Sequence, residues 1–365
     1  MRRIFLFMLT LVMTCTGLLA QETSTDEPAI PTGDVSVTAE VTAEPTAEPT
    51  APVELAKGVN YPDPGSYTVQ EKFELGTRQF RIYIPGGYPD AEARGESVPL
   101  VMVLHGAGGN GTWIEGVTSF DLVAERETFI VVYPDGINGG WGDGRSFFDP
   151  NDDVSYLTHV MDFVSGQFEI DPARIYSTGY SMGGMMSFRL GCLLPDRIAA
   201  VASVASTFPR YQRAECDEAP PVPVMMVLGT NDSVIPWNGE HISYLSALAS
   251  VEYWAEHNEC AQGPNVTEEF DVDPDDSIKA RRETFNQCAD DTEVTLYGVV
   301  GGDHTWPGHP FSVGEPEITG TSMDFDATVA IWNFFQRHTS AGSPADAEAT
   351  MEATAEETEE PAESE

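Results

Sequence analysis

Basic residues are scarce in this sequence. Its 365 residues include 18 Lys and Arg against 59 Asp and Glu, so the formal net charge at pH 7 is -41. A surface with this excess of negative charge repels nucleic acids and anionic lipid headgroups, and we therefore expect neither as a partner. Long apolar runs are also missing after residue 20, so no transmembrane helix is expected in the rest of the chain.

The two ends of the chain differ in composition from the middle. Residues 1–20 begin with Met1-Arg2-Arg3 and continue as an apolar stretch to Ala20, a signal-peptide pattern that predicts a secreted, extracellular protein. A lipoprotein anchor at Cys15 is the weaker alternative, because the preceding residues fit a lipobox poorly. Residues 21–60 and 340–365 are rich in Thr, Glu, Ala or Pro, and we expect a disordered linker and a disordered acidic tail. A single domain of α/β class over residues 61–339 remains between them.

A serine flanked by glycines follows a strand-like run. The sequence G-Y-S-M-G-G at residues 179–184 comes directly after the run at 174–178. This is the strand, sharp turn and helix context of a nucleophile elbow, with Ser181 at its tip. Because small residues occur in many turns, the motif alone does not separate a catalytic serine from a structural turn.

An acid and a base follow in a compatible order. Asp232 comes after the apolar run 222–228, and His304 comes after the run 294–300. The carboxyl ends of parallel strands meet at one edge of a sheet, so three loops distant in sequence can build one site. Ser, Asp, His is also the chain order of α/β-hydrolases. The sequence therefore predicts Ser181, Asp232 and His304 as nucleophile, acid and base, with Asp303 as the rival acid.

A glycine-containing loop predicts the oxyanion site. The buried strand expected at 99–104 leads into the loop formed by residues 105–109, His105-Gly106-Ala107-Gly108-Gly109, which we name the HG loop. Hydrolases of this kind supply one donor from such a loop and a second from the residue after the nucleophile. We therefore expect the backbone amides of Ala107 and Met182 to form an oxyanion hole, with His105 bracing the loop rather than transferring protons.

Several motifs together resemble the polyhydroxybutyrate-depolymerase-type esterases, a family that includes secreted feruloyl esterases and carbohydrate esterases of the acetylxylan-esterase type. The resemblance covers roughly residues 67–337 and rests on L-H-G (104–106), Y-P-D-G (133–136), G-Y-S-M-G-G (179–184), G-T-N-D (229–232) with I-P (235–236), and G-G-D-H-T-W-P-G (301–308). It implies an α/β-hydrolase fold, a mostly parallel central sheet with helices on both faces, and a serine esterase without cofactor or metal. Ala107 departs from the pattern, since many relatives carry cysteine there. Because the expected oxyanion donor is the backbone N–H and not the side chain, we expect alanine at this position to cost little activity.

Other segments predict the frame around these loops. We expect an opening hairpin from 67–75 and 79–84, strands at 129–133 and 199–205, and helices at 154–168, 241–257 and 325–338. The remaining histidines lie in helix-like segments or after a Pro-Gly turn and have no expected catalytic role: His159, His241, His257, His338 and His309.

The acidic run at residues 271–276 raises the question of calcium. It lacks the glycine and the distal glutamate of an EF-hand loop. We interpret it as a solvated turn, with a calcium site around Asp273 as the lesser alternative.

Four cysteines follow the first 20 residues, and four cysteines allow three pairings. Joining neighbours, Cys192 to Cys216 and Cys260 to Cys288, would brace the loops that carry the predicted triad. Free buried thiols are the alternative, and a metal site is disfavoured because no Cys-x-x-Cys or His pair accompanies them.

Aromatic residues on the loops of the catalytic edge suggest the substrate. Trp141, Trp237 and Trp306 are predicted to contact substrate, since aromatic faces there suit a sugar ring or a hydroxycinnamoyl group, and Trp141 and Trp306 are expected to form an aromatic wall. Burial in the core is the competing possibility. The chain has no added polymer-binding module, which favours feruloyl or acetyl esters on plant polysaccharide such as xylan over a polyhydroxybutyrate polyester. A catalytically inactive, wall-associated binding protein is a remote alternative. The oligomeric state is left open.

Overall fold

The computed structural model describes residues 63–73, 76–145, 152–239, 242–261, 263–272, 274–275, 277–309 and 320–340. The expected signal peptide with Cys15, the linker, the tail after residue 340, His241 and Asp273 lie outside them, so what the sequence predicts there stays a prediction. No helix in the described part of the chain combines the length and apolarity needed to span a membrane.

Ten strands of the described residues form one sheet in the order β1-β2-β4-β3-β5-β6-β7-β10-β9-β8. The strands are β1 (Gly65–Phe73), β2 (Gly76–Ile84), β3 (Val98–Leu104), β4 (Ile130–Pro134), β5 (Ile170–Tyr180), β6 (Ala200–Val204), β7 (Val224–Gly229), β8 (Val266–Phe270), β9 (Lys279–Phe285) and β10 (Val294–Val300). Neighbours from β4 to β10 in this order pair in parallel, whereas β1, β2, β8 and β9 pair antiparallel at the two edges. The predicted mostly parallel central sheet is confirmed.

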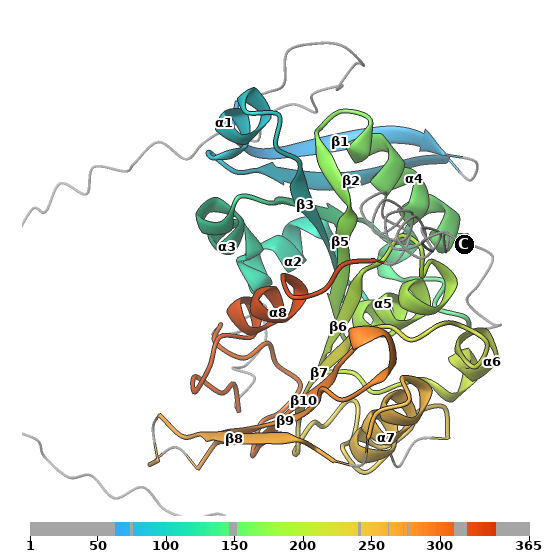
Figure 1. Ribbon diagram of the computed structural model, residues 1–365, viewed down its shortest axis with the longest axis vertical. Helices are drawn as coiled ribbons and strands as arrows, with labels where there is room; N and C mark the ends of the chain where they lie inside the picture. Colours follow the sequence, from blue (N-terminus) through green and yellow to red (C-terminus); the bar gives the residue numbers. More distant parts are fainter. Residues whose placement is uncertain are drawn as a thin grey trace, which may run out of the picture. The chain divides into compact units, whose positions relative to one another are not determined.

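The helices are α1 (Tyr88–Ala93), α2 (Gly111–Thr118), α3 (Phe120–Glu127), α4 (Asp153–Ser165), α5 (Met182–Leu193), α6 (Arg213–Cys216), α7 (Ala247–His257) and α8 (Ala327–Phe335), with short 3-10 turns η1 (Ile137–Gly139), η2 (Arg210–Gln212) and η3 (Ala289–Asp291). In Figure 1, α2, α3 and α8 lie on one face of the sheet, and α4, α5 and α7 lie on the other. The prediction of helices on both faces is therefore also confirmed.

The sheet separates two hydrophobic cores. Every residue of β3 is buried, and its side chains alternate between them: Leu100, Met102 and Leu104 pack with α4, α5 and α7, whereas Val101 and Val103 pack with α2, α3 and α8. A central parallel strand is covered on both faces, which is why this segment reads as a continuous apolar run rather than an alternating one. The core thus fixes the central strands whose carboxyl ends carry the predicted site.

Local capping decides where the predicted helices begin. Asp152 caps α4, its side chain accepting a hydrogen bond from the N–H of Ser155 at 3.0 Å. Ser246 caps α7 in the same way, so this helix starts at 247 rather than at the expected 241. Asp326 caps α8, which runs over 327–335 instead of 325–338.

Two disulfides join the predicted partners. Cys192 in α5 is bonded to Cys216 at the end of α6, and Cys260 after α7 is bonded to Cys288 before η3. The predicted pairing is confirmed, and the alternative of free thiols is wrong. The first bridge ties the helix that follows Ser181 to the segment that leads into β7.

Candidate active site

Ser181 stands at the tip of a sharp turn between β5 and α5. Its φ of 53° and ψ of -116° are unusual for a residue with a side chain, and its N–H donates to the carbonyl of Val204 at 2.8 Å. Glycines make the turn possible: a Cβ on Gly179 would lie 2.4 Å from the carbonyl carbon of Gly183, and one on Gly183 would lie 2.2 Å from the carbonyl oxygen of Leu104. The turn therefore presses the start of α5 against the end of β3.

Asp232 and His304 are brought into direct contact. Nδ1 of His304 lies 2.8 Å from Oδ2 of Asp232, and because a carboxylate only accepts, the ring nitrogen carries the hydrogen. Oδ1 of the same carboxylate accepts from the N–H groups of Val234 at 2.9 Å and Ile235 at 2.7 Å. The buried carboxylate is thereby fixed in orientation, and it fixes the tautomer of the imidazole so that Nε2 is left as the proton acceptor.

Backbone contacts join the loops that carry these residues. The N–H of Asn231 donates to the carbonyl of Gly302 at 2.9 Å, and that of Gly301 donates to Oγ1 of Thr230 at 2.9 Å. Tyr180, the last residue of β5, donates from its hydroxyl to the carbonyl of His304 at 2.8 Å, and the two rings lie 4.9 Å apart. The residue next to the serine thus anchors the histidine loop. The sequence did not predict this role, because Tyr180 occupies the position before the serine at which the motif allows any residue.

The described contacts of Ser181 do not include a hydrogen bond from its hydroxyl to His304. In free enzymes the contact between nucleophile and base is often long and tightens when substrate binds. The arrangement thus places the three predicted residues on adjoining loops and joins the acid to the base.

Asp303, the rival acid, has a different set of partners. Its Oδ1 accepts from the N–H and the hydroxyl of Ser233, both at 2.9 Å, and from the backbone N–H of His304 at 2.7 Å. Partial burial raises the pKa of Asp303, but the hydrogen bonds from Ser233 and His304 outweigh this and hold the pKa below its ordinary value. The carboxylate therefore ties the two loops together through their backbones, and the imidazole is oriented by Asp232.

The predicted oxyanion donors flank the elbow. Within the described residues, the N–H groups of Ala107 and Met182 have no protein acceptor. A Cβ on Gly106 would lie 2.7 Å from the ring of Tyr180, so only glycine lets the HG loop lie this close to the end of β5. The N–H of Gly108 donates to the carbonyl of Gly139 at 2.7 Å, which holds the exposed tip of the loop.

His105 is buried and braces the loop, as expected. Its Nε2 accepts from the N–H of Gly136 at 2.9 Å, which leaves the hydrogen on Nδ1 to donate to the carbonyl of Gly106 at 2.8 Å. Burial lowers the pKa of His105 below its ordinary value, so the ring is neutral near pH 7. A neutral ring with both nitrogens occupied has no capacity left for proton transfer.

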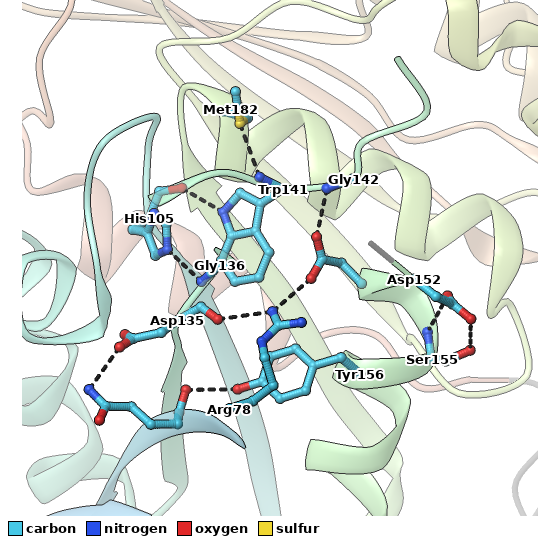
Figure 2. A network of polar contacts seen from close by, with 12 residues as sticks. Arg78, His105, Asp135, Gly136, Trp141, Gly142, Asp152, Ser155, Tyr156 and Met182 are labelled. Carbon is cyan, nitrogen blue, oxygen red and sulfur yellow. Dashed lines mark hydrogen bonds and ion pairs between the residues drawn. The ribbon is translucent and has the colours of Figure 1, made fainter. Parts of the chain in front are cut away.

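Two of the three tryptophans expected to contact substrate are core residues. Trp306 is 0% exposed, and its indole N–H donates to Oγ1 of Thr328 on α8 at 2.9 Å. Trp141 is 2% exposed, and its indole N–H donates to the carbonyl of His105 at 2.8 Å (Figure 2). The prediction of an aromatic wall is wrong for both, because no ring face is left for a ligand. Trp237 is half-buried beside Gly298 of β10, and its role as a substrate contact stays a prediction.

The described residues contain no group of three or more His, Cys, Asp or Glu side chains arranged to hold a metal ion. Of the acidic run, the described residues 271, 272, 274 and 275 lie between β8 and β9.

A serine elbow after a central parallel strand, with acid and base after later strands, is the arrangement of α/β-hydrolases. Residues 99–221 match the family described as alpha/beta hydrolase fold. The "Putative esterase NocK" of Nocardia uniformis subsp. tsuyamanensis is 30% identical over 269 residues, which make up 67% of this chain and 75% of that protein. The chain belongs to the α/β-hydrolase family and is an esterase of that family.

Two fungal relatives align over smaller shares. Feruloyl esterase B of Piromyces equi is 28% identical over 62% of this chain and 42% of its own length. A bifunctional acetylxylan esterase/xylanase of Neocallimastix patriciarum is 30% identical over 43% of this chain and 22% of its own length. This chain therefore corresponds to less than half of either fungal protein.

Proposed function

We propose that the protein is a secreted serine esterase that hydrolyses feruloyl or acetyl esters on plant polysaccharide through an acyl-enzyme. The observation that carries the proposal is the buried Asp232–His304 hydrogen bond on loops anchored to the Ser181 elbow through Tyr180. The substrate class is supported by the two fungal relatives, one named as a feruloyl esterase and the other as an acetylxylan esterase/xylanase.

The first half-reaction transfers the acyl group to the enzyme. Oγ of Ser181 attacks the ester carbonyl carbon while Nε2 of His304 takes the hydroxyl proton. The carbonyl oxygen becomes an oxyanion that accepts hydrogen bonds from the amides of Ala107 and Met182. When the tetrahedral intermediate collapses, the bond to the sugar oxygen breaks and the imidazolium returns its proton to that oxygen. Asp232 stabilises the imidazolium throughout.

The second half-reaction releases the acid. A water molecule gives a proton to Nε2 of His304 and attacks the acyl carbon, which forms a second oxyanion in the same hole. Collapse breaks the bond to Oγ of Ser181, which recovers the proton from the imidazolium. The products are an alcohol on the polysaccharide and free ferulate or acetate, and the enzyme returns to its starting protonation state.

The assignment of the nucleophile is tested with p-nitrophenyl acetate. We expect Ser181→Ala to lower kcat by several orders of magnitude, while Ser97→Ala, a change at an exposed serine before β3, leaves it unchanged. Adding His304→Ala to Ser181→Ala should cost little more, because members of a triad act as a unit. Turnover by Ser181→Ala close to the wild-type value would contradict the mechanism.

The substrate class is tested separately with methyl ferulate, acetylated xylan and hydroxybutyrate oligomers. We expect the highest kcat/KM on one of the first two substrates. Preferred cleavage of hydroxybutyrate oligomers would overturn the polysaccharide assignment without affecting the nucleophile. A mature protein that begins at Gln21 would support secretion.

A further inference from the structure

One segment of the chain touches the surroundings of both proposed oxyanion donors. Residues 135–142 follow β4. Midway, the carbonyl of Gly139 accepts from the N–H of Gly108 in the HG loop at 2.7 Å, and a Cβ on Gly139 would come within 3.0 Å of Cα of Gly108. Two residues later, the backbone N–H of Trp141 lies 3.3 Å from Sδ of Met182. The path of this segment therefore bears on where the HG loop and the start of α5 lie.

One buried ion pair contacts both ends of the segment, where it adds to the hydrogen bonds from the N–H of Asp135 to the carbonyl of Gln79 and from Arg189 to the carbonyl of Gly142. Nη2 of Arg78, on β2, donates to the carbonyl of Asp135 at 3.0 Å and to Oδ1 of Asp153 at 2.7 Å. Oδ2 of Asp153, the first residue of α4, accepts from the N–H of Gly142 at 2.7 Å. Figure 2 shows this chain of bonds running from Asp135 through Arg78 to Gly142.

The guanidinium has little freedom to move. Its Cζ lies 3.7 Å from the centroid of the Tyr156 ring on α4, and the Tyr156 hydroxyl donates to the carbonyl of Gln79 at 2.8 Å. Arg78 is 5% exposed and Asp153 is 0% exposed. The ion pair, the aromatic ring and the neighbouring strand therefore form one fixed unit.

Stability alone does not account for a pair of this kind. Removing two charges from water costs about as much as their attraction returns, and apolar pairs of similar volume are often as stable. What an ion pair adds is control of geometry, because each of its hydrogen bonds to residues 135–142 has a defined donor, acceptor and angle. Apolar side chains at positions 78 and 153 would fill the space without holding the carbonyl of Asp135 or the N–H of Gly142.

We propose that Arg78 and Asp153 are positioning residues of the oxyanion hole. Their ion pair clamps the two ends of residues 135–142, and the clamped segment sets the spacing between the amides of Ala107 and Met182. The inference rests on the proposed function, because it assumes that these amides bind the oxyanion. Neither side chain touches substrate, and the effect passes through the backbone of the segment.

The clamp is tested by replacing the pair with apolar residues. Arg78→Met removes the donor to Asp135 but leaves a buried carboxylate unpaired, and this variant is at risk of misfolding. The double variant Arg78→Met/Asp153→Leu removes the contacts of the ion pair to Asp135 and Gly142 without leaving a buried charge at either position. It keeps the test valid if the single variant does not fold. Arg81→Met is the matched control, because Arg81 lies on the same strand and forms a partly buried ion pair with Glu115.

We expect kcat on p-nitrophenyl acetate to fall about 10- to 100-fold in the clamp variants, less than the ~100- to 1000-fold typical of losing one oxyanion donor. KM should change less than about threefold, since the lost interaction is made in the transition state. Arg81→Met should lose stability but keep kcat.

Inhibition by phenylboronic acid gives an independent measure. Its boron bonds to Oγ of Ser181 while the serine proton passes to His304, and the tetrahedral adduct places an oxygen in the oxyanion hole. The inhibition constant should rise in the clamp variants in proportion to the fall in kcat/KM, a correlation that a purely structural role would not produce.

Two results would overturn the inference. One is a folded double variant with wild-type kcat and wild-type boronate affinity. The other is a loss of kcat no greater than that of Arg81→Met at the same loss of melting temperature. If either result is found and Ser181→Ala is inactive, only the clamp proposal is rejected. If Ser181→Ala is active, the proposed function itself is rejected.

Discussion

Replacing Trp306 should damage the fold and leave substrate preference unchanged. The side chain is 0% exposed and packs edge-to-face with Phe120, the two ring centroids lying 6.3 Å apart. Its indole N–H donates to Thr328, whose hydroxyl in turn donates to the carbonyl of Thr118 at 2.6 Å. The ring therefore joins the segment after His304 to α8 and α2, and it has no face turned to solvent.

The expected magnitude follows from this burial. Truncating a buried aromatic side chain to alanine typically costs about 3–5 kcal/mol of unfolding free energy, through lost burial and the cavity that remains. Trp306→Phe keeps most of the ring but removes the donor to Thr328, so we expect a smaller cost of about 1–3 kcal/mol. Urea unfolding of the wild-type protein and both variants measures these values.

Kinetics on two esters provide the decisive comparison. At a temperature where Trp306→Ala is folded, kcat/KM for methyl ferulate and for p-nitrophenyl acetate should fall together, and their ratio should stay within about twofold of the wild-type ratio. A core residue disturbs the His304 loop for every substrate alike. Unchanged unfolding free energy with a selective loss on methyl ferulate would refute the reasoning and make Trp306 a substrate contact.

Two further predictions concern the site. Asp232→Asn should lower kcat by about 10⁴-fold, because the amide favours the wrong imidazole tautomer, whereas Asp303→Asn keeps an acceptor oxygen and should cost less than about tenfold; equal losses in parallel kcat measurements would contradict the assignment of the acid. Burial lowers the pKa of His105, so below the ordinary pKa of 6.5 the unfolded chain binds a proton at this residue that the folded chain does not bind. The contribution of neutral His105 to stability is therefore complete above pH 6.5. It is lost as pH falls below 6.5, by at most about 1.4 kcal/mol per pH unit. The unfolding free energies of the wild type and of His105→Gln, measured from about pH 8 to 5, should therefore converge on acidification. Taking the difference between the two proteins removes the contribution of other groups such as Asp121, whose pKa burial raises to about 7. If the two plots of unfolding free energy against pH stay parallel, the assigned role of His105 is contradicted.

Central elements could be predicted from the sequence because their surroundings are uniform. The strand expected at 294–300 is β10 over the same residues, since a strand covered on both faces is apolar at most positions. The outer strands β8 and β9 were not predicted. They carry Glu268, Glu269, Arg281 and Arg282 at an exposed edge of the sheet, and such a composition resembles that of a loop.

The limits at the site have a similar origin. The loops for Ser181, Asp232 and His304 follow strands with strong patterns, so their positions could be predicted. Whether a loop residue is buried depends on which elements pack over it. The residues next to Trp306 in the sequence do not indicate that Thr328 and α8 will pack against it. Arg78 likewise reads as an ordinary hairpin residue, because its partner Asp153 lies 75 positions away.

The two cystines bear on how the chain acquires its shape during synthesis. Each joins cysteines that are consecutive along the described chain, 24 and 28 residues apart. Among four cysteines, three pairings are open when all are present at once. A chain that emerges from its amino end presents Cys192 and Cys216 before the second pair exists. The order of emergence alone therefore favours the pairing observed, and neither bridge has to wait for the carboxyl end of the chain.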